Sequence, residues 1–170
     1  MSAEILFVSE VKDMPAFRDL LVEYYRIILK TFEAAGGPIL VPEEMADSNI
    51  EHLDETLPPE GRLALAYCED QKLLGCGALR RIRPDAVEMK RMFVRPEAQG
   101  QGLGKRLFEM RIEEARKMGC GAVYADTAKG NRPMLAMYER FGFHYIQRYP
   151  ENANPPEFEP YLVFLEYRFS

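Results

Sequence analysis

A glycine-rich segment, QGQGLGKRL at residues 99–107, contains the residue types that most directly indicate ligand chemistry. Gly100, Gly102 and Gly104 alternate in it, directly in front of a run with the apolar spacing of a helix. Glycine costs about 0.5–1 kcal/mol relative to alanine inside regular structure, so three of them indicate a backbone that a ligand approaches closely. Amides at a helix N-terminus carry partial positive charge and bind phosphate groups. We therefore expect this segment to hold a phosphate-bearing ligand, with added charge from Lys105.

The spacing of the glycines separates three patterns that bind phosphate groups. The P-loop pattern G-x-x-x-x-G-K-[ST] would need glycine at Gln99 and a hydroxyl side chain at Arg106, and the sequence has neither. The dinucleotide fingerprint G-x-G-x-x-G would need glycine at Lys105. The pattern that fits is Q-x-x-G-x-G at Gln99, Gly102 and Gly104. These mismatches disfavour a nucleotide-binding enzyme.

Two segments resemble motifs of one superfamily. Residues 88–119, EMKRMFVRPEAQGQGLGKRLFEMRIEEARKMG, are similar to the acetyl-CoA motif of the GNAT acyltransferase superfamily. Residues 131–143, NRPMLAMYERFGF, resemble the family's segment that runs from asparagine through tyrosine to Gly-Phe. With the order of the strands, the resemblance covers roughly residues 60–148. It implies an N-acetyltransferase that uses acetyl-CoA as co-substrate and needs no metal. The alternative is a noncatalytic domain that binds or senses acyl-CoA.

The resemblance also implies two catalytic side chains. In this family an amine attacks the thioester directly, so an amine proton must leave and a thiolate must gain one. Tyr138 matches the acid near the sulfur, and an ordinary tyrosine pKa of about 10 keeps it protonated at neutral pH. Glu88 matches the base glutamate of the histone-acetylating branch. Each also has a structural interpretation: Tyr138 as a core aromatic side chain, and Glu88 as a strand carboxylate paired with Arg81 or Lys90.

The cofactor contacts follow from the same resemblance. Backbone groups of Phe93 and Val94, beyond a bulge expected in their strand, would hold the pantetheine and polarise the thioester carbonyl. Asn131 would contact the cofactor, although its position before a helix also fits an N-cap. The full set of expected cofactor-binding residues is Met92, Phe93, Val94, Gln99, Gly100, Gln101, Gly102, Leu103, Gly104, Lys105, Asn131 and Tyr138.

The acceptor is expected to be a primary amine of a small molecule, an amino acid or a peptide. An acidic segment at residues 41–59 lies where the family often shapes its acceptor site, and it could attract a cationic amine. The alternative is a solvated helix face. Tyr24 and Tyr25 could line the acceptor pocket, or they could pack in the core. The acidic residues are Glu43, Glu44, Asp47, Glu51, Asp54 and Glu55.

Periodicity and turn residues predict the elements that position these groups. Helices are expected at residues 13–37, 41–59, 103–119 and 131–142, with Asp13 as the first N-cap. Strands are expected at residues 4–11, 61–69, 72–83, 87–94, 122–126, 143–149 and 161–169. The strand before the glycine segment and the strand after its helix form a crossover unit, so they should be parallel. We expect an α/β (α+β) GNAT fold: a mixed, mostly antiparallel sheet with one parallel crossover pair and helices on both faces.

Composition limits the remaining possibilities. The 170 residues fit one domain over residues 1–170, with 47% hydrophobic and 29% charged residues. A net charge of −5 lacks the basic footprint of a nucleic-acid binder. No run approaches the roughly 20 apolar residues of a membrane span, so we expect a cytoplasmic protein that does not enter membranes. The three cysteines and two histidines show no zinc-ligand spacing. The oligomeric state stays open, with a homodimer as one option.

Overall fold

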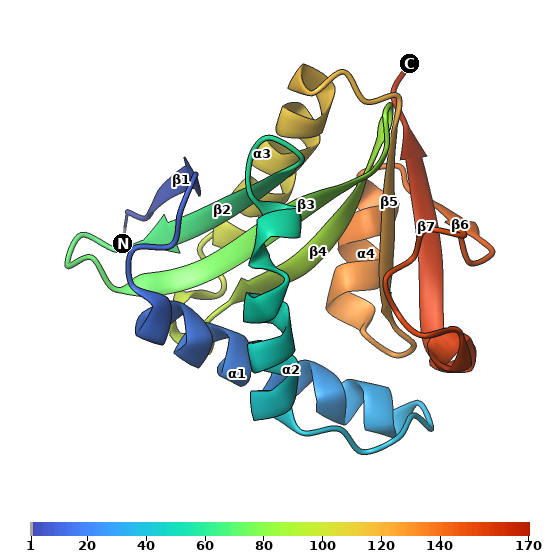
Figure 1. The fold of residues 1–170 in the computed structure, drawn as a ribbon, viewed down its shortest axis with the longest axis horizontal. Helices are drawn as coiled ribbons and strands as arrows, with labels where there is room; N and C mark the ends of the chain where they lie inside the picture. The colour runs from blue at the N-terminus through green and yellow to red at the C-terminus, as the bar shows by residue number, and fades with distance from the viewer. Residues whose placement is uncertain (1) are drawn as a thin grey trace.

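The computed structural model describes residues 2–170, whose strands form one mixed sheet (Figure 1). The strand order is β1-β2-β3-β4-β5-β7-β6, and in the described residues β4 and β5 are the one parallel pair of neighbours. The strands are β1 (Glu4–Val8), β2 (Gly61–Tyr67), β3 (Leu73–Arg83), β4 (Ala86–Val94), β5 (Ala122–Ala128), β6 (His144–Ile146) and β7 (Leu162–Arg168). The expected mixed sheet with one parallel crossover pair is confirmed.

Helices lie on both faces of this sheet, also as expected (Figure 1). They are α1 (Met14–Ala34), α2 (Pro42–Glu51), α3 (Leu103–Lys117) and α4 (Arg132–Arg140). α1 and α2 bury Phe17, Leu20 and Ala46 in a cluster with apolar side chains of β2 and β3. α3 and α4 bury Phe108 and Tyr138 on the opposite face. Each helix presents one apolar stripe to the sheet, and removing that surface from water stabilises the layers.

The first helix begins and ends where the sequence predicts. The Asp13 carboxylate accepts a hydrogen bond from the Ala16 amide at 3.1 Å, and Pro15 lies in the first turn. Beyond the last turn, Gly36 has a φ of +100°, a conformation that favours glycine.

Several predicted elements are shorter than expected. The first strand ends at Val8, and the second helix ends at Glu51. A 3-10 helix at Leu53–Thr56 follows, in which the Thr56 hydroxyl donates to the Leu53 carbonyl at 3.0 Å. The strand predicted at residues 143–149 keeps only His144–Ile146, because Tyr149 turns inward to bond Glu88.

The two parallel strands separate part-way along their length, and this shapes the site. Pairing joins residues 86–89 of β4 to residues 122–125 of β5, although both strands continue further. From Lys90 onward, the edge of β4 that faces β5 has no strand partner among the described residues. In Figure 1 the two strands visibly diverge from their shared end. The separation leaves backbone amides and carbonyls of β4 available to a ligand.

A bulge interrupts β4 at the start of this free edge, as expected. Ala78 pairs with Lys90 and Cys76 pairs with Phe93, so Arg91 and Met92 both lie opposite Gly77. Arg91 has a φ of +55°.

The bulge changes the direction of the side chains that follow it. Simple alternation places Met92 on the face of Glu88 and Lys90. Instead Met92 packs with the α3 residues Leu103 and Leu107 on the opposite face. The extra residue in the bulge shifts the alternation by one.

Candidate active site

The glycine-rich segment at residues 99–107 forms a loop, the glycine loop, in which two of the glycines have open space beside them. Gly100 and Gly102 have φ values of +81° and +79°, and a Cβ atom at either would meet no described atom within 4 Å. Gly104 differs, because a Cβ there would lie 3.3 Å from the Met92 side chain. The first two glycines therefore allow the backbone conformation and the free approach of a ligand, whereas Gly104 allows α3 to pack closely on β4.

The start of α3 has the properties of an anion site. Gly102 is its N-cap residue, and no side chain of the described residues caps it. The first-turn amides of an α-helix have no intrahelical acceptor, so they can donate to a phosphate group. Gln99 ties the loop to β4 by donating to the Val94 carbonyl at 2.9 Å. Lys105 is exposed near Glu109, whereas Arg106 donates to the Ala3 carbonyl and is held away from the loop.

A buried arginine supports the bulge from behind. Arg111 on α3 is completely buried and donates to the carbonyls of Ala78 and Lys90 at 3.2 and 3.3 Å. A Cβ atom at Gly77 would lie 2.7 Å from the Arg111 Nε. Arg111 was not singled out by the sequence analysis. Its spacing was a signal, because a charged residue four positions after Leu107 lies on the apolar face of the helix. Arg111 holds the carbonyls that the bulge frees.

Tyr138 lies in an aromatic cluster on the α3 and α4 face. Its ring centroid is 5.5 Å from that of Phe108 and 5.0 Å from that of Phe143, and the residue is buried. Burial raises the pKa of its hydroxyl well above the usual value, and the charge of Arg111 partly opposes this shift. The hydroxyl is therefore protonated at neutral pH, as a proton donor must be. The placement fits both interpretations of Tyr138, so its role as the acid stays a prediction.

Asn131 does not act as the predicted helix cap. It occupies the N-cap position of α4, but its side chain makes no capping hydrogen bond. Its amide donates instead to the Thr127 hydroxyl at 2.8 Å, which links the helix entry to the end of β5. Its contact with the cofactor stays a prediction.

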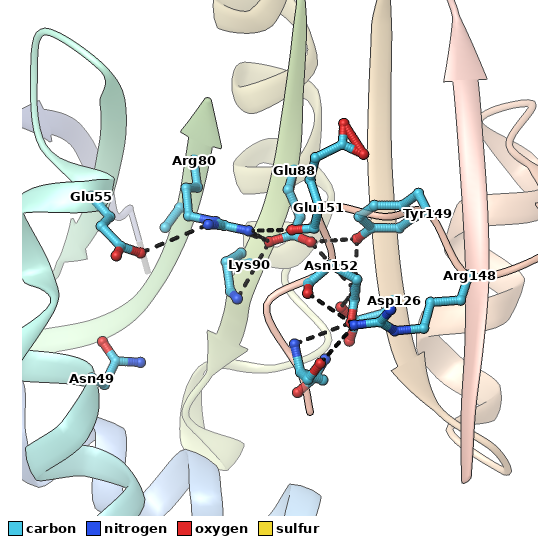
Figure 2. A network of polar contacts seen from close by, with 12 residues as sticks. Asn49, Glu55, Arg80, Glu88, Lys90, Asp126, Arg148, Tyr149, Glu151 and Asn152 are labelled. Atoms are coloured by element: carbon cyan, nitrogen blue, oxygen red, sulfur yellow. Dashed lines mark hydrogen bonds and ion pairs between the residues drawn. The ribbon is translucent and has the colours of Figure 1, made fainter. Parts of the chain in front are cut away.

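Glu88 lies at the centre of a buried polar network (Figure 2). Its Oε1 accepts a hydrogen bond from Arg80 at 3.2 Å and lies 3.4 Å from the Lys90 ammonium. Its Oε2 accepts a hydrogen bond from the Tyr149 hydroxyl at 2.5 Å. The predicted pairing with Lys90 is confirmed, and the alternative pairing with Arg81 is wrong. Strand register places Arg80 opposite Glu88, so Arg81 points to the other face.

The segment after β6 closes over Glu88 and extends the network to β5. The Asn152 amide donates to the Tyr149 hydroxyl at 3.0 Å and to the Asp126 carboxylate at 2.8 Å (Figure 2). Arg80 also donates to the Glu151 carbonyl at 2.8 Å. Sequence reasoning missed Asp126, Tyr149 and Asn152, because only the separated strands and the returning segment bring them together.

Burial shifts the protonation of this network. It raises the pKa of Asp126, and the nearby charge of Glu88 raises it further. Burial lowers the pKa of Lys90, although Glu88 opposes that shift. Burial also raises the pKa of the Tyr149 hydroxyl far above the usual tyrosine value. Groups with shifted pKa values facing the gap between β4 and β5 are typical of a reaction site.

The acidic segment contributes mainly surface ion pairs. Glu43 pairs with Arg26 at 3.0 Å and Asp47 pairs with Arg18 at 2.7 Å, all four side chains being partly or largely exposed. These contacts favour the interpretation as a solvated helix face. Glu55 is the exception, because it lies 3.9 Å from Arg80 and so borders the network.

The predicted acceptor-pocket tyrosines lie on the same face of the sheet as Glu88. Tyr24 packs edge-on against Tyr25 and Phe93, with centroid distances of 4.9 and 5.7 Å. The Tyr25 hydroxyl accepts a hydrogen bond from the Asn49 amide at 3.0 Å. Tyr24 therefore borders the bulged part of β4, whereas Tyr25 links α1 to α2.

A surface hollow of about 600 Å³ lies between α1 and the loop after β5, where it is lined by Lys30, Thr31, Lys129 and Gly130 among others. A second, of about 200 Å³, lies further along α1. The larger hollow borders the end of β5 at which β4 and β5 have separated. Neither is lined by Glu88 or Asp126.

Comparison with known proteins identifies the family. Residues 15–143 match the sequence model of the acetyltransferase (GNAT) family. An uncharacterized N-acetyltransferase of Schizosaccharomyces pombe is 31% identical over 159 residues, which are 91% of this chain and 93% of that protein. The chain belongs to the GNAT family. It is therefore an acyltransferase.

Other GNAT proteins match over less sequence or in structure. The IAA acetyltransferase of Azospirillum brasilense is 35% identical over 95 residues, 55% of this chain and 60% of that protein. An acetyltransferase structure from Streptococcus agalactiae has a TM-score of 0.75 at 21% identity, covering 98% of each chain. The PaiA N-acetyltransferase of Thermoplasma acidophilum, solved in complex with coenzyme A, has a TM-score of 0.72 at 19% identity, covering 99% of this chain and 100% of that one. These structures confirm the GNAT fold. No helix of residues 2–170 is long and apolar enough to span a membrane.

Proposed function

We propose that this GNAT protein transfers the acetyl group of acetyl-CoA directly to a primary amine of a small molecule, an amino acid or a peptide. The observation that carries the proposal is the open glycine loop, which leads into the uncapped start of α3 beside the free edge of β4. This cradle suits a ligand with a phosphate end and an extended, hydrogen-bonding chain. The names of the relatives and the coenzyme A complexes among the structural neighbours support this assignment.

Acetyl-CoA would supply the activated acetyl thioester, and the chain would bind and orient it. The loop amides from Gly100 to Lys105 would hold the pyrophosphate. Backbone groups of Phe93 and Val94 on β4 would hold the pantetheine chain. Bound in this way, the thioester would lie beside the gap between β4 and β5, which the Glu88 network borders.

The reaction requires two proton movements. The amine nitrogen forms the new bond to the acetyl carbon, and the bond from that carbon to sulfur breaks. Tyr138 would give its hydroxyl proton to the departing sulfur. The proton lost by the amine would go to Glu88. Because Glu88 is completely buried and bonded by Tyr149, this proton would reach it through a neighbouring group or a water rather than directly.

The proposal is tested by measuring thiol release from acetyl-CoA with a panel of amines, amino acids and peptides. Isothermal titration with coenzyme A runs in parallel. We expect binding together with amine-dependent thiol release and a product heavier than the amine by one acetyl group. A noncatalytic acyl-CoA-binding domain predicts binding without thiol release. Failure to bind coenzyme A would overturn the assignment of the glycine loop.

A further inference from the structure

The bulge of β4 holds a cation without a partner. The Nε and Nη1 atoms of Arg91 are buried and have no hydrogen-bond acceptor among the described residues. A buried charged donor without a partner costs more than an ordinary unmade hydrogen bond. Arg91 also has a φ of +55°, which is uncommon for a residue other than glycine. Two unfavourable features at one residue beside the predicted cofactor contacts of β4 suggest a function for its side chain.

The carboxylates of the Glu88 network are engaged by other groups. Glu88 is bonded by Arg80 and lies beside Lys90, and Asp126 accepts a hydrogen bond from Asn152. Within residues 2–170, Arg91 makes no ion pair. The group that would satisfy the guanidinium is therefore not supplied by the described part of the chain.

Arg91 and Asp126 lie on the two strands at the point where β4 and β5 have separated. Burial raises the pKa of the Tyr24 hydroxyl and lowers that of the Lys90 ammonium, and the charges of Arg91 and Asp126 act on both groups in opposite directions. Arg91 belongs to the free edge of β4, and Asp126 lies on β5 just beyond the last paired residue, Ala125. A cation and an anion on either side of the gap suit a ligand that carries both charges.

We propose that Arg91 binds a carboxylate of the acceptor while the acceptor's amine faces Asp126, so that the acceptor is an amino acid and not a simple amine. This inference rests on the proposed acetyl transfer and names the substrate class of the same site. A guanidinium is well suited to carboxylate recognition, because its planar N–H groups match the carboxylate oxygens. The acceptor would supply the partner that Arg91 lacks.

The test compares acceptors that differ in the carboxylate alone. Initial rates of thiol release are measured for common L-amino acids, for their amides and for the amines formed by their decarboxylation. For the wild type we expect kcat/KM to be about 10- to 100-fold higher for the best amino acid than for its amide, the range for a hydrogen bond to a charged group. Equal values for the acid and the amide, or acetylation only of amines without a carboxylate, would overturn the proposal.

Variants of Arg91 assign the preference to this residue. Arg91→Gln should lose most of the preference by losing activity on the amino acid alone, and Arg91→Lys should retain part of it. Arg116→Gln is the matched control, because Arg116 is exposed on the outside of α3 beside Glu113. An equal loss on acid and amide, or a preference that survives in Arg91→Gln, would refute the assignment. If Arg91→Gln does not fold, as judged by thermal melting, the wild-type comparison decides the proposal.

Titration with coenzyme A separates this inference from the function on which it rests. We expect Arg91→Gln to bind coenzyme A as the wild type does. Coenzyme A binding by the wild type, with acetylation of simple amines only, would refute the inference and leave acetyl transfer intact. Absence of coenzyme A binding would refute both.

Discussion

Tyr138 combines two properties that a catalytic acid needs, a protonated hydroxyl and a fixed ring. Phenylalanine at this position would keep the ring contacts with Phe108 and Phe143 and remove only the hydroxyl. We expect Tyr138→Phe to lower turnover by about ten- to ten-thousandfold, the range for one positioned acid, with unchanged coenzyme A affinity. Tyr145→Phe is the control, because Tyr145 is exposed on β6. A turnover within about twofold of the wild type would leave Tyr138 with a structural role only.

Glu88 raises a different question, because the same carboxylate can be a base or an anchor for Arg80 and Tyr149. We expect Glu88→Gln to keep coenzyme A affinity and to lose rate chiefly at lower pH. The variant should approach the wild-type rate as pH rises, because an amine that is already deprotonated no longer needs a base. Turnover is measured against pH for both proteins.

The control for Glu88 is Glu166→Gln, which removes the charge of another strand carboxylate that accepts a hydrogen bond from a tyrosine hydroxyl, that of Tyr124. Parallel pH profiles of the wild type and Glu88→Gln, with melting temperature and rate lowered together, would identify Glu88 as structural.

Individual residues of the site were predictable to different degrees. Glu88, Tyr138 and the glycines belong to contiguous motifs, so their spacing was sufficient to single them out. Asp126 stands in a short apolar run, and Arg91 stands among charged and apolar neighbours on one strand. Neither has a local signal. Their importance follows from where β4 bulges and where β5 separates from it, which depends on contacts distant in sequence.

The glycine loop and α3 act together as one element, and the loop can be tested against a matched position. Gly102 and Gly119 lie at opposite ends of α3, with φ values of +79° and +80° and no described atom within 4 Å of a Cβ. Valine should therefore strain the backbone similarly at both. We expect Gly102→Val alone to abolish coenzyme A binding in calorimetric titration. Equal binding by the two folded variants would contradict the phosphate-binding role of the loop.

The β4 bulge depends on the close packing of Arg111 against Gly77, so it can be tested without a ligand. Alanine at Gly77 would place a Cβ atom 2.7 Å from the Arg111 Nε. We expect Gly77→Ala to lower the free energy of unfolding by about 1–3 kcal/mol, as overpacking does. Gly121→Ala is the control, because a Cβ there would meet no described atom within 4 Å. Equal denaturation midpoints for both variants would show that Arg111 does not constrain the bulge.

Element boundaries were predictable where local signals set them. Asp13 and Pro15 mark the start of α1, and Gly119 follows the end of α3. The segment around Tyr149 reads as a strand because of its aromatic residues. Its course is determined instead by a hydrogen bond to Glu88, which lies 61 positions earlier in the chain. A contact between residues so far apart in the chain cannot be predicted from the local sequence pattern.

For the molecule as a whole, the buried network should reduce stability. A carboxyl whose pKa is raised by folding binds protons more tightly in the folded state than in the unfolded state. Its ionisation therefore destabilises the protein increasingly as pH rises from the unfolded value, near 3.8, through the raised value. Proteins tolerate such costs at functional sites.

Asp126→Asn tests this cost, because the neutral amide keeps an oxygen for the bond from Asn152. We expect the variant to melt at a higher temperature than the wild type at neutral pH, with the difference shrinking as pH falls toward 4. Asp47→Asn is the opposite control: Asp47 is exposed and Arg18 lowers its pKa, so its loss should leave stability unchanged or slightly lower. A neutral-pH melting temperature for Asp126→Asn at or below the wild-type value would show that Asp126 stabilises the fold. In that case the ionised carboxylate would be compensated by Lys90 and Asn152, and the network would be a structural element and not a site maintained at the expense of stability.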